Sequence, residues 1–97
     1  MNIQAQKFAE RQEFWISQGV SGCDVYDKLA GDPELPLYYS DVDLSAIAGI
    51  SPHALRQRRS RGQEPPFMRL SQRCVRYPRA TSLQWLSSMF HSRSAKH

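Results

Sequence analysis

Apolar residues recur at helical spacing near the start of the chain. The positions that share or adjoin one helical face over residues 3–18 are Ala5, Phe8, Ala9, Gln12, Trp15 and Ile16. This spacing predicts an amphipathic helix, and Gly19 ends it. So short a helix is not stable alone in water, so its large apolar side chains must be buried against something.

A second, shorter helix is predicted to follow over residues 22–30. Ser21 is suited to be its N-cap, and Gly31 stands just beyond its end. The proline-containing segment 32–36 then breaks regular structure. We interpret this segment as the boundary between a helical arm, residues 1–39, and the remainder of the chain.

Beyond the boundary the pattern predicts two short helices joined by a tight turn. The first starts at a weak capping-box pattern in residues 40–43 and ends at Gly49. Ser51-Pro52 starts a second helix at once, because Ser is a good N-cap and Pro suits the first helical position. This helix runs to about Arg61, and Gly62 closes it. Two helices with this spacing form a helix-turn-helix.

The chain then changes to short runs typical of strands. Residues 67–70 and 74–77 flank the polar turn 71–73, which predicts a hairpin, and Pro78 ends its second strand. A last helix is predicted over residues 79–90. Its apolar positions at or beside helical spacing are Leu83, Trp85, Leu86, Met89 and Phe90.

The predicted fold class is therefore mainly α with a small β-hairpin. Helix, turn, helix, hairpin and helix is the order of a winged helix-turn-helix, here expected over residues 40–97 and preceded by the arm. The chain has 97 residues and a mass of 11.2 kDa, which suits one small domain with an extra arm. It is too short for a two-domain enzyme with a cleft between its domains.

Charge divides the chain into two unlike halves. Residues 1–50 have three Lys or Arg against eight Asp or Glu, a net charge of −5. Residues 51–97 have nine Arg and one Lys against Glu64 alone, a net charge of +9. The guanidinium group of Arg donates paired hydrogen bonds to phosphates and to guanine edges, so the second half of the chain is suited to bind a polyanion. A basic face that is merely solvated is the plain alternative.

The basic half resembles a known family. The matching residues are the stretch 44–56 (LSAIAGISPHALR), Gly62, Pro65-Pro66-Phe67, Arg69-Leu70, the run 73–77 (RCVRY) and Trp85-Leu86. Together, over about residues 40–87, they resemble the excisionase and AlpA-type DNA-binding domains, which are related to the MerR winged helix. Phages, plasmids and integrated elements commonly encode such domains. The resemblance implies DNA binding, in transcriptional control or in directing site-specific recombination.

The chain departs from the family pattern in two places. Position 58 is often aromatic in the family and packs between helix and wing, whereas this chain has Arg58. That change either loosens the wing or adds a phosphate contact. Residues 1–39 match nothing in the family, so no family function transfers to the arm.

Helix geometry indicates which residues of the second helix face DNA. If Leu55 faces the core, His53, Gln57 and Ser60 lie roughly opposite it. Recognition helices read bases mainly through their first turns, so we expect base contacts from His53, Arg56 and Gln57. Arg58 and Arg59 are nearer the Leu55 side and are expected to reach phosphates or to pair with Asp41 or Asp43.

In the hairpin, Arg73 is placed to enter a minor groove or to follow the backbone. Arg69 and Arg76 alternate with apolar residues and would line a phosphate track or a solvated face. The complete set of expected DNA-contacting residues is Ser51, His53, Ala54, Arg56, Gln57, Arg58, Arg59, Ser60, Arg61, Arg69, Arg73 and Arg76.

Other chemistry is not supported by the sequence. No nucleophile with an oriented base is evident, so we predict no catalytic residues and no enzyme activity. Cys23 and Cys74 are far apart and outside any CxxC motif, which predicts reduced thiols, no metal site and no cofactor. With no signal segment and no apolar run of spanning length, we expect a cytoplasmic, nucleoid-associated protein without membrane contact.

The expected partner is double-stranded DNA, bound by a homodimer or a cooperative oligomer, because one small winged domain contacts few bases. We expect residues 3–18 to mediate self-association and not to cover the winged half. Alternatively, the chain is an excisionase-type directionality factor, or an adaptor whose arm binds a recombinase or another regulator. Single-stranded RNA binding is disfavoured, because the aromatic residues have core spacing.

Overall fold

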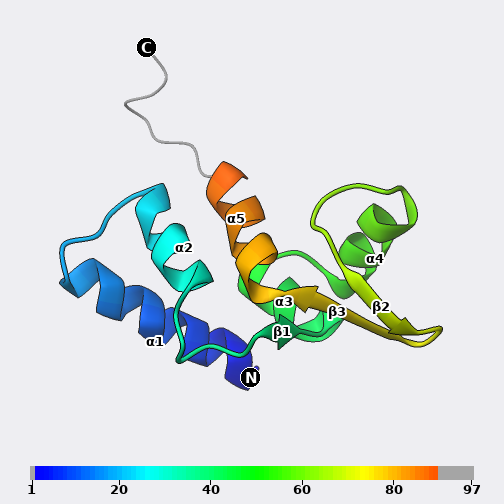
Figure 1. Cartoon of the computed structure of the whole chain (residues 1–97), viewed down its shortest axis with the longest axis horizontal. Coiled ribbons are helices and arrows are strands. Elements are labelled where there is room, and N and C mark those ends of the chain that lie inside the picture. The colour runs from blue at the N-terminus through cyan, green and yellow to red at the C-terminus, as the bar shows by residue number, and fades with distance from the viewer. Residues whose placement is uncertain (1, 90–97) are drawn as a thin grey trace, which may run out of the picture.

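The computed structural model describes residues 2–89, which contain five helices and a small antiparallel sheet (Figure 1). The elements are α1 (Ile3–Ser17), α2 (Cys23–Ala30), β1 (Tyr38–Tyr39), α3 (Asp41–Ala48), α4 (Pro52–Ser60), β2 (Met68–Ser71), β3 (Cys74–Pro78) and α5 (Arg79–Met89). The predicted mainly α fold, with its hairpin between the helix-turn-helix and the last helix, is confirmed. Phe90, at the predicted end of that helix, lies outside the described residues.

Local capping sets the geometry of the helix-turn-helix. The Ser40 hydroxyl accepts a hydrogen bond from the Asp43 N–H at 3.1 Å, and the Ser51 hydroxyl accepts one from the Ala54 N–H at 3.0 Å. Gly49 ends α3 with φ at 78°, a left-handed conformation that glycine adopts without strain. These predicted caps are confirmed. The predicted N-cap of α2 is wrong by one residue, because Gly22 and not Ser21 occupies that position.

The hairpin belongs to a sheet with strand order β1-β3-β2. The sequence did not predict β1, whose two tyrosines pair with Pro78 and Tyr77 of β3. On the other side of β3, Arg69 pairs with Val75 and Ser71 pairs with Cys74. The register therefore shifts between Arg69 and Ser71, and β2 is the outer strand of the wing.

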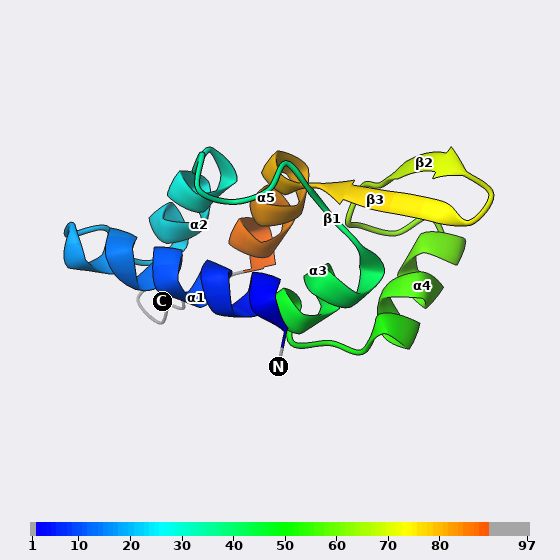
Figure 2. The same cartoon turned by 90° about the horizontal axis from the view of Figure 1, so that it is seen from below.

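The arm packs onto the winged half, which corrects our expectation for residues 3–18. Helix α1 lies along α2 and reaches α3, and α2 packs against α5 (Figure 2). Phe8 is buried in the same apolar core as Leu29, Leu44 and Leu83. The arm therefore covers the winged half. The second part of that expectation, self-association, is still a prediction.

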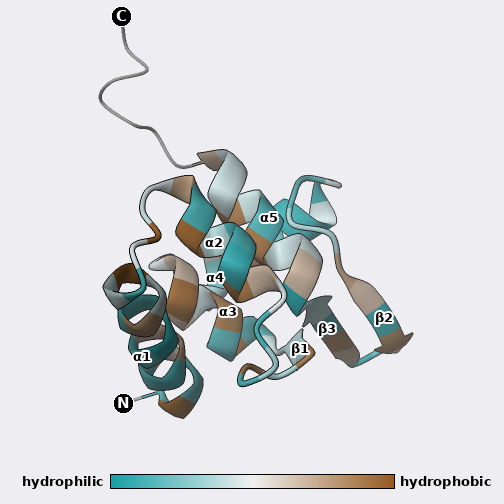
Figure 3. Cartoon of the chain, turned by 60° about the vertical axis from the view of Figure 1, so that its left-hand side comes forward, coloured by the Kyte–Doolittle hydropathy of each residue, from teal (hydrophilic) through white to brown (hydrophobic). Residues whose placement is uncertain are grey.

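Some apolar side chains of α1 are nevertheless left at the surface. Ile3 and Ile16 are more than half exposed, and Phe14 is partly exposed. Figure 3 shows α1 as mostly hydrophilic, with brown segments near its two ends. The core thus uses the middle of the helix, at Phe8, more fully than its ends.

The predicted boundary segment is a tightly bonded junction. Asp32 is buried, and its carboxylate accepts hydrogen bonds from Arg11 Nε at 2.7 Å, Trp15 Nε1 at 2.9 Å and the Glu34 N–H at 2.9 Å. Burial alone would raise the pKa of Asp32, but these hydrogen bonds and the charge of Arg11 outweigh it and hold the pKa below its ordinary value.

Arg79, the first residue of α5, closes the other side of this junction. Its guanidinium donates hydrogen bonds to the carbonyls of Ala30, Asp32 and Leu35 at 2.8–2.9 Å. Its own N–H donates to the Leu37 carbonyl at 2.7 Å. Arg79, which directly follows β3, thus donates hydrogen bonds to main-chain carbonyls at the end of α2 and in the segment after it.

Candidate nucleic-acid interface

Helix α4 has the buried and exposed sides that its sequence predicts. Leu55 is fully buried beneath it. His53, Arg56 and Gln57 are exposed, as are Ser51, Ser60 and Arg61, while Ala54 is half-buried. The prediction that Leu55 faces the core and the first-turn polar residues face outward is confirmed. These side chains are therefore available to a partner.

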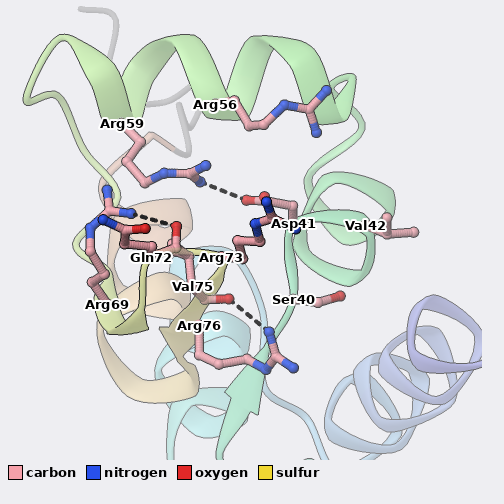
Figure 4. A pocket seen from close by; sticks show the side chains of 10 residues that line it. All are labelled: Ser40, Asp41, Val42, Arg56, Arg59, Arg69, Gln72, Arg73, Val75 and Arg76. Carbon is pink, nitrogen blue, oxygen red and sulfur yellow. Dashed lines mark hydrogen bonds and ion pairs between the residues drawn. The ribbon is translucent and has the colours of Figure 1, made fainter.

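A pocket of about 380 Å³ separates α4 from the wing. It is lined by Ser40, Asp41, Val42, Arg56, Arg59, Arg69, Gln72, Arg73, Val75 and Arg76. Figure 4 shows Arg56 and Arg59 extending from α4, while the other three arginines come from the hairpin. The structure therefore brings five of the predicted DNA-contacting arginines together around one cavity.

One of the five arginines is held by a polar cluster. Arg59 Nη1 donates to Asp41 Oδ1 at 2.8 Å and also to the Tyr77 hydroxyl, which in turn donates to Asp41 at 2.8 Å. The three residues come from α4, the first turn of α3 and β3. This confirms the predicted pairing of Arg59 with Asp41. The cluster therefore ties α4 to α3 and to β3 of the hairpin.

Protonation in this cluster follows from its burial and bonding. Burial, together with the hydrogen bond to Asp41, raises the pKa of Tyr77 to about 12. Burial would lower the pKa of Arg59, but its bonds to Asp41 and Tyr77 outweigh that and raise it. Near neutral pH the cluster therefore contains a phenol, a guanidinium and a carboxylate.

The remaining arginines of the pocket have no carboxylate partner among residues 2–89. Among residues 2–89 the ion pairs are Arg11 with Asp32 and Arg59 with Asp41. Arg69 and Arg76 donate only to nearby main-chain carbonyls, those of Gln72 and Val75. The pocket thus has five guanidinium groups and one carboxylate. Like charges repel across this cavity, so an anion bound in it would relieve the repulsion.

Arg58 is placed differently from the other arginines of α4. Its guanidinium carbon lies 5.4 Å from the centre of the buried Trp85 ring, and Nη1 donates to the Glu64 carbonyl at 3.0 Å. It does not line the pocket. Arg58 therefore makes a cation–π contact with Trp85. Arg61 is exposed beyond the end of α4 and also lies outside the pocket.

Sequence reasoning missed part of this site. Ser40, Val42 and Gln72 line the pocket although they were not among the predicted contacts. The ring of Tyr77 is buried, in keeping with the core spacing of the aromatic residues, but its hydroxyl bonds to both Asp41 and Arg59. Nothing local in the sequence marks these residues, because only the fold brings the start of α3 and the hairpin together beside α4.

Other kinds of site find no support in the part of the chain that the structure describes. Residues 2–89 contain no group of three His, Cys, Asp or Glu arranged to hold a metal ion. Over the same residues, no helix combines the length and apolar character needed to cross a bilayer. Comparisons with protein-family models, curated proteins and solved structures find no match to this chain.

Proposed function

We propose that this protein is a sequence-specific double-stranded DNA-binding regulator of the kind encoded by phages, plasmids and other mobile elements, acting in the cytoplasm at the nucleoid. One observation carries the proposal. A cavity between α4 and the wing gathers five arginines, four of which have no carboxylate partner among residues 2–89. Helix α4 would enter the major groove and the β2–β3 hairpin would act as the wing.

The spacing of the parts supports this arrangement. A recognition helix in the major groove and a wing in the next minor groove leave one sugar-phosphate strand between them. The arginine pocket lies in that position, so it would hold phosphates and fix the register of the protein on the duplex. His53, Arg56 and Gln57 would then read base edges, since Arg forks onto guanine and Gln onto adenine. Arg73 lies at the hairpin turn and would reach the minor groove.

Electrostatics supports the same orientation. Four of the acidic residues of the arm, Glu10, Glu13, Asp24 and Asp27, lie on α1 and α2, away from α4 and the hairpin (Figures 1 and 2). A duplex that approaches the arginine pocket therefore meets the basic end first. The arm would repel DNA and so disfavour the reversed approach.

A second candidate function rests on the surface of the arm. Phe14 and Ile16 are exposed, and a pocket of about 240 Å³ between α1 and α2 is lined by Ile16, Val20 and Val25 among others. This surface favours a protein partner, such as a recombinase or a second copy of the chain. It is compatible with an excisionase-type directionality factor that binds DNA with one end and a protein with the other.

The test is a titration of the full chain into a duplex of about 30 base pairs, with salt raised from about 50 to 200 mM. We compare Arg56→Ala/Arg73→Ala with Lys7→Ala/Lys28→Ala, a matched pair that removes the same charge from the arm. The pocket variant should lose most of its affinity and show a shallower salt dependence. The arm variant should bind nearly as well as the wild type, because its lost charges lie away from the pocket.

Two results would count against DNA binding at this pocket. In the first, the wild-type chain does not bind duplex DNA at low salt. In the second, the two variants lose the same affinity, which would show that net charge alone drives the association.

A further inference from the structure

Between its first and last paired residues, the outer strand of the wing contains one residue more than the matching stretch of β3. Met68 and Arg69 pair in register with Arg76 and Val75, but the next pair is Ser71 with Cys74. Leu70 is therefore the extra residue of a β-bulge and has no partner on β3. Bulges bend a strand and redirect a side chain, and they are common beside functional sites.

The side chain at this bulge is large, apolar and exposed. Leu70 is 60% exposed and is separated by Ser71 alone from the two-residue turn of the hairpin. Its neighbours Arg69, Gln72 and Arg73 all line the arginine pocket, whereas Leu70 does not. The Leu70 side chain thus points away from the pocket that we assign to phosphates, although polar residues on both sides of it in the sequence line that pocket. It is not one of the residues of the buried apolar core.

We infer that Leu70 is an apolar wedge that enters the minor groove and partly unstacks one base step of the bound duplex. The inference rests on the proposed function. With the backbone strand in the pocket on one side of the hairpin, the tip and the other side of the hairpin face the adjacent minor groove. Leucine is among the side chains that minor-groove proteins insert between bases, usually beside basic residues that hold the phosphates. Here Arg69 and Arg73 flank it.

A wedge predicts a particular kind of sequence preference. Unstacking costs least at pyrimidine–purine steps such as TpA, and it bends the duplex away from the inserted side chain. The apolar contact releases no counterions, so its contribution to affinity does not depend on salt. These two properties separate Leu70 from the neighbouring arginines, whose contribution weakens with salt.

The experiment uses the full chain and two duplexes of about 30 base pairs that differ only in a central run of TpA or of ApA steps. The variants are Leu70→Ala, Leu70→Met and, as control, Leu37→Ala, which removes an equally exposed leucine outside the pocket and the wing. Affinity is measured across a salt series. Energy transfer between dyes on the two duplex ends reports bending.

The wild type should prefer the TpA duplex and bend it. Leu70→Ala should lose roughly tenfold in affinity for that duplex, with the salt slope unchanged and the bend reduced. Leu70→Met should retain most of the affinity and the bend, and Leu37→Ala should behave as the wild type. Because Leu70 is exposed, we expect melting temperatures to change little.

The wedge is overturned if Leu70→Ala binds both duplexes as the wild type does, or if it changes the salt slope as Arg73→Ala does. In either case duplex binding itself would survive. If the wild type binds neither duplex, the proposed function fails and the wedge fails with it.

Discussion

Arg73 and Arg79 are close together in the sequence but are bonded in opposite ways. Arg79 donates to three main-chain carbonyls of the segment that leaves α2. Arg73 lines an open pocket beside three further arginines that have no carboxylate partner in residues 2–89. The bonds of Arg79 give it a part in the fold, whereas a group of arginines without carboxylate partners supports the anionic ligand that we propose.

Asp32 and Asp41, the two carboxylates that pair with arginine among residues 2–89, show the same contrast between a part in the fold and a place at the pocket. The Asp32 side chain is fully buried and bonds to three donors of the arm and its junction. The Asp41 side chain is about a quarter exposed at the rim of the arginine pocket and neutralises one arginine of five. Asp32 stabilises the junction, while Asp41 positions one cation and leaves the pocket basic.

The largest effect expected from this contrast is at Asp32. Asp32→Asn leaves the charge of Arg11 without its partner in a buried site, so the free energy of unfolding should fall by about 4 kcal/mol in urea titrations. Asp24→Asn, which changes an exposed carboxylate of α2, is the matched control and should be nearly neutral.

The same substitution tests the titration of Asp32. Because its pKa in the folded state lies below the ordinary value, Asp32 contributes stability above about pH 4, and this is lost as pH falls through the folded pKa. Stability of the wild type should fall over that acidic range more steeply than that of Asp32→Asn. Parallel pH profiles would show that Asp32 does not titrate as its bonding requires.

A slightly smaller loss is expected at Arg79. Arg79→Ala leaves three carbonyls of the junction without their donor, so we expect it to cost about 3 kcal/mol. Arg79→Lys should recover only part of this, since an ammonium does not reproduce the planar fork. Arg73→Ala is the control and should leave the free energy of unfolding nearly unchanged. Equal losses for Arg73→Ala and Arg79→Ala would remove the contrast between the two arginines.

Within the proposed interface, substitutions should separate base contacts from phosphate contacts. Arg56→Ala and Gln57→Ala should each change the relative affinity for operator variants by about 1–3 kcal/mol. Arg73→Ala should weaken all duplexes similarly and make the salt slope shallower by about one unit. Competition binding across a set of duplexes measures both. A uniform loss for all three variants would show that the base-reading face is wrongly assigned.

The smallest effect is expected in the hydrogen-bonded cluster of Arg59, Asp41 and Tyr77, which connects α3, α4 and the wing. Tyr77→Phe keeps the buried ring but removes the hydroxyl that bonds to Asp41 and Arg59, a loss of about 1 kcal/mol. Burial raises the pKa of Tyr77 to about 12, above its ordinary value of about 10. Tyr77 therefore contributes to the stability of the fold below about pH 10, and this contribution is lost as the pH rises toward 12. The melting temperatures of the variant and the wild type should therefore differ mainly at neutral pH and less at alkaline pH.

Features with a local cause could be predicted from the sequence. Ser40 and Ser51 cap their helices through hydrogen bonds three residues away, and Gly49 ends α3 through its own backbone freedom. The outward face of α4 follows from helical periodicity once Leu55 is placed in the core. Such interactions span a few residues, so the sequence alone contains what is needed to infer them.

Features that depend on distant partners could not be predicted. Strand β1 has only two residues and exists because Tyr39 pairs with Tyr77. The apolar side of α1 suits a dimer interface and intramolecular burial equally well, and only the fold shows Phe8 in the shared core. Segment 32–36 contains two prolines typical of a linker, but Asp32 within it meets Arg11 from α1.

The bonds from Arg79 to residues 30–35 also determine how the two ends of the molecule respond to one another. They join α5 to the exit of α2 across more than forty residues of chain, so α2 and α5 cannot separate without breaking them. A ligand that binds only the folded protein increases the free energy of every such opening. DNA held at the wing should therefore slow hydrogen exchange of the α2 amides, although α2 lies at the opposite end of the molecule.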